Sequence, residues 1–386
     1  MIPVLTPEQS AAWDASAQSG GIAIEALMES AGRGAAAVIT ARLPDALRLG
    51  VLVAVGTGHN GGDGWVVARA LHALGLSVWV TSVAGDRRPL TAAAAARALQ
   101  SRVREVAPDG PWPGVGLVVD AVLGTGATGR PRDEVARLMG RLTDLEVPVV
   151  AIDGPTGLDL ANGVSAGALQ ALMTITFGGY RRGHLLARDE VGDLVVVDIG
   201  LPPVPAEWPR LLTDLDAALH LVPFSSKSYK GTRGRVVVIG GDAGMVGAAR
   251  LASRAAFAVG AGLVHLVAPP ESIAALGEAE PDLQTLAHPF DGPIDGRLAD
   301  LLTNANAVIL GPGMGRRPGR TAWVAACAAL GTAPLLIDAD GLIALQGDAE
   351  LLSRIAAARP VVITPHAGEF RALFPELANG SGVDPW

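Results

Sequence analysis

The stretch GVLVAVGTGHNGGDGWVVARALHALG, residues 50–75, places an apolar run, a glycine-rich turn and a helical pattern in direct succession. An unbroken run of small apolar residues is typical of a strand buried on both faces of a parallel sheet. The glycines within 56–64 have no side chains, so backbone N–H groups at the helix start are free to meet an anion. The same loop is also consistent with a tight strand-to-helix turn capped by Asp63.

The same alternation recurs along the chain and predicts two doubly wound α/β units. Helical patterns such as the one after residue 64 separate the apolar runs, which end at glycine or aspartate. We place the divide in LPPVPAEWPRLL (201–212), because its four prolines stop both helix and sheet, giving domains 1–209 and 210–386. The predicted strands lie within residues 50–56, 77–83, 117–124, 147–154, 194–200, 234–241, 262–269, 306–313, 333–340 and 359–366.

Composition excludes several classes of protein. Of the 386 residues, 49% are apolar and 18% charged, which excludes intrinsic disorder. The net charge of −8 argues against a nucleic-acid partner. Cys327 is the single cysteine, so neither a disulfide framework nor a cysteine-based zinc site is expected. Charged or proline residues interrupt every long apolar stretch and no basic segment opens the chain, so we expect a cytoplasmic protein without membrane association.

Carboxylates follow two further strands of the first half. Asp120 lies in VVDAVLGTGATGRP, and Asp153 in AIDGPTGLDLANG. Ligands of open parallel sheets bind beyond the carboxyl ends of the strands, so Asp120, Asp153 and Asn60 are expected to converge on one crevice. Oxygen ligands of this kind suit a hard cation better than zinc. The alternative is that each aspartate caps the turn that follows it.

These segments, with TITFGGYRRGHLL and the helical stretch EALMESAGRGAA, resemble the NAD(P)H-hydrate epimerase family over roughly residues 1–200. The resemblance implies a Rossmann-like domain that repairs damaged nicotinamide cofactors by interconverting the R and S epimers of hydrated NADH or NADPH. It implies potassium bound by Asn60, Asp120 and Thr156. It assigns the substrate to His59, Asn60, Gly61, Gly62, Asp63, Gly124, Thr125, Gly126, Ala127, Thr128, Gly129, Arg130 and Asp153.

Asp153 is the candidate catalytic residue. Inverting a carbon that bears a hydroxyl group requires a proton donor and acceptor beside that hydroxyl. A carboxylate in a dry crevice can hold a pKa near neutrality, so Asp153 is expected to do so. Arg181 stands near a position where the family usually has lysine.

The second half carries glycine-rich and acidic segments at its strand ends. GPGMG (311–315), IDADGL (337–342) and VITPHAGEFRAL (362–373) occur in this order after KSYKGTRG (227–234). They resemble the ADP/ATP-dependent NAD(P)H-hydrate dehydratase family, a ribokinase-like fold, over about 214–375. The resemblance implies ADP or ATP with Mg²⁺ as cofactors. It also implies that the hydrated nicotinamide is bound by Gly315, His366, Ala367, Gly368, Glu369, Phe370, Arg371 and Ala372.

After this segment the family has a Lys-Gly nucleotide contact and a glycine-rich turn with a catalytic aspartate. This sequence ends at PELANGSGVDPW without either motif. We therefore expect a ribokinase-like domain that lacks its C-terminal part and has impaired dehydration of S-NAD(P)H hydrate. The expected protein is a bifunctional repair enzyme, a homo-oligomer acting on the small molecules NADHX and NADPHX. A non-catalytic nucleotide-binding or regulatory module and a ribokinase-type kinase remain alternatives.

Overall fold

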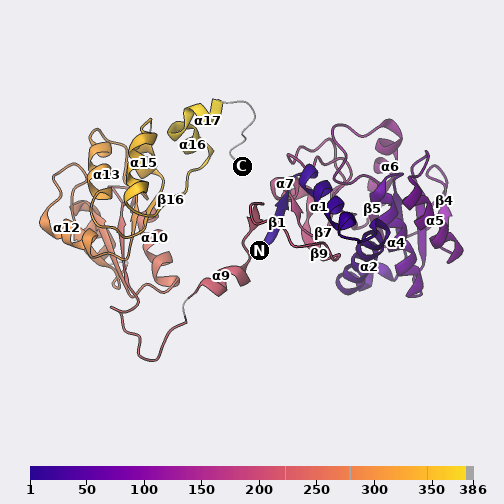
Figure 1. Ribbon diagram of the computed structural model, residues 1–386, viewed down its shortest axis with the longest axis horizontal. Helices are drawn as coiled ribbons and strands as arrows, with labels where there is room; N and C mark the ends of the chain where they lie inside the picture. The colour runs from indigo at the N-terminus through magenta and orange to yellow at the C-terminus, as the bar shows by residue number, and fades with distance from the viewer. Residues whose placement is uncertain (222, 278–279, 346, 380–386) are drawn as a thin grey trace. The chain divides into compact units, whose positions relative to one another are not determined.

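The chain folds into two compact units, Met1–His220 and Leu221–Trp386 (Figure 1). The computed structural model describes residues 1–221, 223–277, 280–345 and 347–379. The last residues of the predicted second domain, 380–386, lie outside the described part.

A seven-stranded sheet, parallel throughout, forms the centre of the first unit. Its order reverses direction between β2 and β5, which opens a crevice at their carboxyl ends. The strands in spatial order are β4 (Arg104–Val106), β3 (Val78–Ser82), β2 (Val51–Val55), β5 (Leu117–Ala121), β6 (Val149–Ile152), β7 (Met173–Phe177) and β9 (Asp193–Val197).

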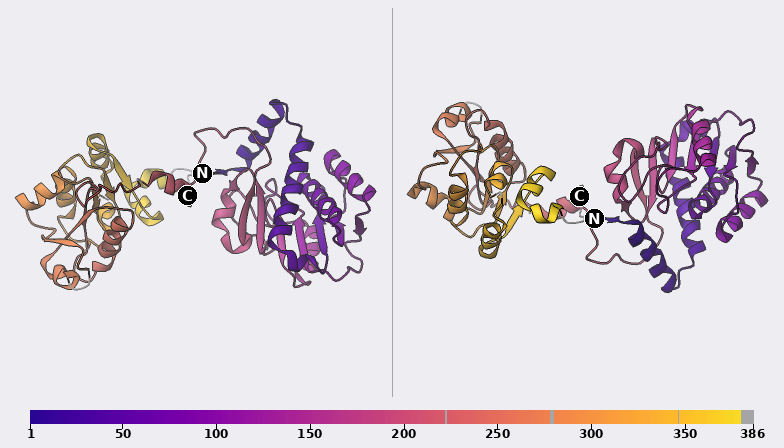
Figure 2. Two further views of the ribbon diagram at one scale, coloured as in Figure 1. Left: turned by 90° about the horizontal axis from the view of Figure 1, so that it is seen from below. Right: turned by 90° about the horizontal axis from the view of Figure 1, so that it is seen from above.

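Helices cover both faces of this sheet. Val51, Val53 and Val55 of β2 pack in one core cluster with residues of α2, α4 and α5, whereas Leu52 and Ala54 pack in another with residues of α6. Alternate residues of a strand point to opposite faces, so this split follows directly from the apolar run. The helices can be followed in Figures 1 and 2; they are α1 (Pro7–Ser19), α2 (Ile24–Arg42), α3 (Pro44–Leu47), α4 (His59–Ala73), α5 (Pro89–Gln100), α6 (Asp133–Thr143), α7 (Arg182–Leu186), α8 (Arg188–Val191) and α9 (Asp214–His220).

A small three-stranded sheet holds the start of the chain against the end of the first unit. β1 (Ile2–Leu5) lies between β8 (Tyr180–Arg181) and β10 (Arg210–Leu211). The Met1 ammonium group also lies 2.5 Å from the carboxylate of Asp216, a residue of α9. Residues 210–220 therefore belong to the first unit, and the proposed boundary after residue 209 precedes the division in the structure.

The second unit contains a six-stranded parallel sheet. Val237 and Ile239 contribute to one core cluster and Val238 to the other, so this sheet is also covered on both faces. Its strands in spatial order are β13 (Gln284–Ala287), β12 (Leu263–Ala268), β11 (Arg235–Ile239), β14 (Ala307–Leu310), β15 (Leu335–Ile337) and β16 (Val361–Ile363). Its helices are α10 (Val246–Ala258), α11 (Pro270–Gly277), α12 (Gly296–Thr303), α13 (Arg320–Ala328), α14 (Asp340–Ala344), α15 (Ala349–Ala358), α16 (Ala367–Leu373) and α17 (Pro375–Asn379).

The α/β class with two parallel sheets is confirmed, and each of the ten predicted apolar runs contains a strand. β9 differs from the expected doubly buried strand, because it lies at the sheet edge and is partly exposed. The sequence did not predict β7, β4, β13 or the small sheet around β1. Among the described residues, no helix has the length and apolar character needed to cross a membrane.

Candidate functional site

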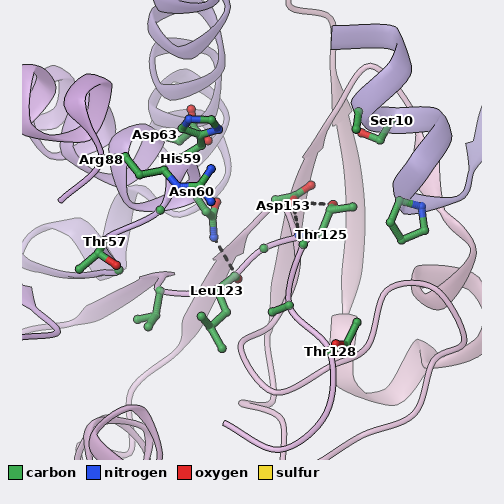
Figure 3. A pocket seen from close by; sticks show the side chains of 18 of the residues that line it. Ser10, Thr57, His59, Asn60, Asp63, Arg88, Leu123, Thr125, Thr128 and Asp153 are labelled. Carbon is green, nitrogen blue, oxygen red and sulfur yellow. Dashed lines mark hydrogen bonds between the residues drawn. The ribbon is translucent and has the colours of Figure 1, made fainter. Parts of the chain in front are cut away.

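The carboxyl ends of β2, β5 and β6 open into a cavity of about 890 Å³ (Figure 3). These strands are neighbours in the sheet, so their following loops meet although they are far apart in sequence. Helix α1 adds a further wall through residues such as Trp13 and Asp14. A crevice is therefore present at the carboxyl ends of these strands, as predicted.

The glycine-rich loop after β2 brings backbone into close contact. A side chain at Gly61 would place its Cβ 1.9 Å from the carbonyl oxygen of Gly56, and one at Gly62 would lie 2.4 Å from Cε of Met28. Helix α4 begins at His59 with Gly58 as its N-cap. Asp63 lies inside the helix, so the alternative that Asp63 caps it is wrong.

Most of the predicted substrate residues line the cavity, and two of them lie behind its lining. His59, Asn60 and Asp63 line the cavity, and Gly61 and Gly62 lie behind the lining, against Gly56 and Met28. All of the residues predicted from the loop after β5 line it as well, namely Gly124, Thr125, Gly126, Ala127, Thr128, Gly129 and Arg130.

Asp153 is held at the cavity wall by three donor groups from two residues. Its Oδ2 accepts hydrogen bonds from the Thr125 backbone N–H at 2.7 Å and from the Thr125 hydroxyl at 2.6 Å. Arg181 Nη2 lies 3.5 Å from Oδ1. The backbone of Asp153 adopts a left-handed φ of 64°, which a non-glycine residue keeps only when its surroundings fix it. Asp153 therefore does not cap the turn that follows it.

The carboxyl groups around this cavity have pKa values shifted in opposite directions. Burial acts to raise the pKa of Asp153, but Arg181, the Thr125 donors and His184 outweigh it, and the net pKa is below its ordinary value. Burial, with the nearby charges of Asp153 and Asp14, raises the pKa of Asp63 well above its ordinary value. The expectation that Asp153 holds a pKa near neutrality is wrong, because the cationic and hydrogen-bonded surroundings of its carboxylate favour the anion.

His184 holds the backbone of Asp153 through a hydrogen bond. Its side chain is fully buried, and Nδ1 accepts a hydrogen bond from the Arg181 backbone N–H at 3.0 Å. Nε2, 2.7 Å from the Asp153 carbonyl oxygen, is then the protonated nitrogen and donates to it. Burial lowers the pKa of His184 to about 4, so the ring is neutral at physiological pH.

A second oxygen-rich cluster surrounds the backbone of Leu123. Asn60 Nδ2 donates to the Leu123 carbonyl oxygen at 3.0 Å, and the Leu123 N–H donates to Thr156 Oγ1 at 3.0 Å. The Thr156 hydroxyl donates to Asp120 Oδ1 at 2.7 Å, and its backbone N–H donates to Asp120 Oδ2 at 2.7 Å. The structure thus connects the three predicted potassium ligands through one loop.

This cluster fits a hard monovalent cation. Asn60 Oδ1 is buried without a hydrogen-bond partner among the described residues, and such an oxygen is a free ligand. The other two members of the cluster supply a hydroxyl and a carboxylate, and oxygen ligands of these kinds suit a hard cation. Burial raises the pKa of Asp120, and a cation beside it would reverse that shift.

Asp120 departs from the predicted convergence. It is fully buried and does not line the cavity, whereas Asn60 and Asp153 do. Asp120 Oδ1 also accepts from the Val122 N–H at 3.2 Å, so the turn-capping alternative holds for this aspartate alongside its contact with Thr156.

Several residues that line the cavity or support it were not part of the predicted site. Trp13 and Asp14 come from α1, whose start carries a visible signal: Thr6 and Gln9 form a capping box with proline at the first helical position. Arg88, Arg132 and the buried Arg181 also line the cavity. His184 was within the quoted motif, but nothing in its sequence spacing indicated its contact with Asp153.

In the second unit, the predicted residues lie at the ends of neighbouring strands. Gly315 follows β14, has a φ of 76°, and donates its N–H to Asp340 Oδ2 at 2.9 Å. His366 follows β16 and caps α16, because its Nδ1 accepts from the Gly368 and Glu369 N–H groups at 3.0 and 3.3 Å. The remaining predicted residues, 367–372, form α16 itself. No hydrogen bond in the described chain joins Gly315 to this helix.

Comparison with known proteins identifies relatives of both units. Residues 24–183 match the family model described as YjeF-related protein N-terminus, and residues 236–383 match that of NAD(P)H-hydrate dehydratase. The chain is 35% identical over 381 residues to a bifunctional NAD(P)H-hydrate repair enzyme Nnr of Pyrobaculum aerophilum, covering 93% of this chain and 73% of the relative. The Nnr protein of Escherichia coli is 36% identical over 360 residues, covering 90% and 67%.

Proposed function

Because this chain belongs to the family of bifunctional NAD(P)H-hydrate repair enzymes, we propose that its first unit interconverts the R and S epimers of hydrated NADH and NADPH. The single observation that supports this reaction is the carboxylate of Asp153, anchored by Thr125 and Arg181 at the wall of the 890 Å³ cavity. The substrate set proposed for this cavity is His59, Asn60, Asp63, Asp153 and the loop 124–130.

Asp153 is the base in this proposal. The hydrated carbon bears a hydroxyl group and is bonded to the ring nitrogen. When Asp153 takes the hydroxyl proton, the carbon–oxygen bond becomes a carbonyl, the bond from carbon to nitrogen breaks, and its electron pair goes to nitrogen. The ring-opened carbon is planar, so closure from the other face gives the opposite epimer.

Asp63 is the matching acid. The nitrogen that receives the electron pair needs a proton, and the raised pKa of Asp63 keeps a proton available in the same cavity. Ring closure returns one proton to Asp63 and the other to the substrate hydroxyl, so the enzyme ends unchanged. Two carboxyl groups with pKa values moved apart by their surroundings are the usual arrangement for acid–base chemistry at neutral pH.

Asn60, Asp120 and Thr156 are the residues that would hold potassium. A bound cation would supply positive charge beside the Asp120 carboxylate and a partner for Asn60 Oδ1. Its role in the proposal is to fix the loop that carries Leu123, Gly124 and Thr125, because Thr125 in turn orients Asp153.

The test is chromatographic conversion of purified R-NADHX to S-NADHX by the 386-residue chain. Asp153→Asn is expected to keep the fold and lose about 100-fold or more in rate, the usual contribution of a general base. Asp144→Asn, at the exposed end of α6, is the matched control and retains the wild-type rate. A rate for Asp153→Asn within twofold of wild type contradicts the assignment.

The potassium proposal is tested in the same assay. Rate and melting temperature are expected to be higher in potassium than in sodium, and Thr156→Val removes the difference. Equal values for the wild type in the two salts would remove potassium from the proposal and leave the role of Asp153 intact.

For the second unit, we propose binding of the hydrated nicotinamide by Gly315 and residues 366–372, with ADP or ATP and Mg²⁺ as the cofactors of dehydration. The supporting observation is that Gly315 and α16 both follow carboxyl ends of strands in one parallel sheet. Formation of NADH from S-NADHX with ADP, followed by absorbance, measures how much of this activity the 386-residue chain has.

A further inference from the structure

The cavity of the first unit has an uneven distribution of charge. Its carboxyl groups are Asp14, Asp63 and Asp153, each affected by burial, and the exposed Glu134. Its arginines include Arg88, Arg130 and Arg132, which are exposed. The fourth lining arginine, Arg181, is buried and is engaged by Asp153 and Thr125.

The exposed arginines lie on two sides of the cavity. Arg88 precedes α5 in the loop after β3, whereas Arg130 and Arg132 lie in the loop after β5. β3 and β5 flank β2 in the sheet, so the two loops face each other across the loop of residues 56–58. Figure 3 shows Arg88 beside His59 and well apart from Thr128 of the opposite loop.

Backbone hydrogen bonds hold both loops, and within the described chain no carboxylate forms an ion pair with their arginines. The Arg88 N–H donates to the Thr57 carbonyl at 3.0 Å, and the Arg132 carbonyl accepts from Ala136 N–H at 2.9 Å in the first turn of α6. None of the three guanidinium groups has an ion pair with a described residue.

An arginine guanidinium has a planar set of donors that matches a phosphate group. A dinucleotide carries two phosphates in its diphosphate bridge, and two facing sets of arginines suit such a bridge better than a single charge. We propose that Arg88 on one side and Arg130 with Arg132 on the other form a phosphate-binding rim that holds the diphosphate of the substrate. This inference rests on the proposed function and adds to it the residues that orient the substrate.

The rim determines which end of the substrate enters the cavity. The diphosphate stays with the exposed arginines, and the uncharged hydrated ring reaches the carboxyl groups of Asp63 and Asp153. The reverse orientation would bring phosphates to those buried acids, and like charges repel at such distances. The rim therefore contributes to binding and positioning, and it does not take part in proton transfer.

The experiment compares Arg88→Gln, Arg132→Gln and the double variant with wild type in the intact chain. Each substitution is expected to raise KM for R-NADHX about tenfold and the double variant more, since a charge-assisted hydrogen bond is removed each time. The loss in kcat/KM is expected to be at least tenfold smaller for hydrated reduced nicotinamide riboside, which carries no phosphate. Arg137→Gln, an exposed arginine of α6 outside the cavity lining, is the matched control with unchanged KM.

Direct binding separates failure of this inference from failure of the proposed reaction. ADP-ribose, which carries the same diphosphate without nicotinamide, is titrated by calorimetry into wild type and the double variant. Binding by wild type that weakens at least tenfold in the double variant supports the rim even if no epimerisation is found. Equal affinities, or equal losses of kcat/KM for the riboside and R-NADHX, overturn it.

Discussion

Asp153 and His184 show how single residues at this site depend on their immediate partners. Arg181 touches Asp153 through Nη2, while Nη1 donates to the Gly179 carbonyl at 2.8 Å and Nε to the Thr125 hydroxyl at 3.2 Å. One buried side chain thus provides charge to the base and fixes the hydroxyl that binds it. Positioning and pKa control come from the same residue.

Replacing Arg181 by methionine is expected to move the acidic limb of the kcat/KM profile of epimerisation to higher pH by about one unit or more. The cation favours the anion of Asp153, so its removal raises the pKa of that carboxyl group, and the base is then protonated under less acidic conditions. The measurement is a pH–rate profile of the variant, with Arg137→Met as the control. An acidic limb at the wild-type pH would show that Arg181 does not set this pKa.

Because the pKa of His184 is lowered from 6.5 to about 4 in the folded protein, the first unit is expected to lose stability as the pH falls through this range. The folded ring binds a proton less readily than the unfolded one, so the unfolded state takes up more protons in this window and gains stability. The full effect is on the order of 3 kcal/mol, from about 1.4 kcal/mol for each pKa unit. Melting temperatures at pH 7 and pH 5 test it. The melting temperature of His184→Gln, whose amide cannot titrate, is expected to fall less between pH 7 and pH 5 than that of the wild type. An identical fall in melting temperature in both proteins would assign the effect to other groups.

At the scale of elements, the β2–α4 connection depends on backbone contact. Gly61→Ala is expected to destabilise the first unit by several kcal/mol, because its Cβ would lie 1.9 Å from the Gly56 carbonyl oxygen and the helix would have to move. Gly58→Ala is the matched control: no atom lies within 4 Å of its Cβ, and its φ of −82° suits alanine. Its cost is expected to be about 1 kcal/mol at most, the usual difference at an N-cap. Urea denaturation of the two variants gives both values, and similar midpoints would contradict this account of the loop.

How well the elements were predicted follows from their composition and length. β2, β5 and β6 are apolar throughout because both faces are buried, so their sequences identify them. β7 reads MTITF, with threonines at buried positions, and β8 and β10 have two residues each, too few for a pattern. The cluster of Asn60, Asp120 and Thr156 was predicted from the family resemblance, whereas the strand ends alone predicted that Asn60, Asp120 and Asp153 converge. Asp14 and Arg88 were not, because the contribution of α1 and of the β3 loop depends on tertiary packing.

For the molecule as a whole, each unit has its own core clusters, and the first extends to His220. A fragment of residues 1–220 is therefore expected to keep the epimerisation rate. A fragment ending at residue 209 loses the pairing of Ile2 with Leu211 and of Pro3 with Arg210, together with the Met1–Asp216 ion pair. It is expected to melt at a lower temperature. Circular dichroism of the two fragments tests this, and equal melting temperatures would place the functional boundary at residue 209.

The position of β1 also affects how the protein is made. β1 pairs with Tyr180 on one side and Leu211 on the other, and Trp13 in the helix that follows donates to the Pro202 carbonyl at 2.9 Å. The ribosome synthesises β1 well before its partners, which are among the last elements of the first unit, so α1 lacks its docking site until most of that unit has been made. The wall that carries Asp14 is completed only when the whole first unit has left the exit tunnel, and unfinished nascent chains cannot yet enclose a substrate.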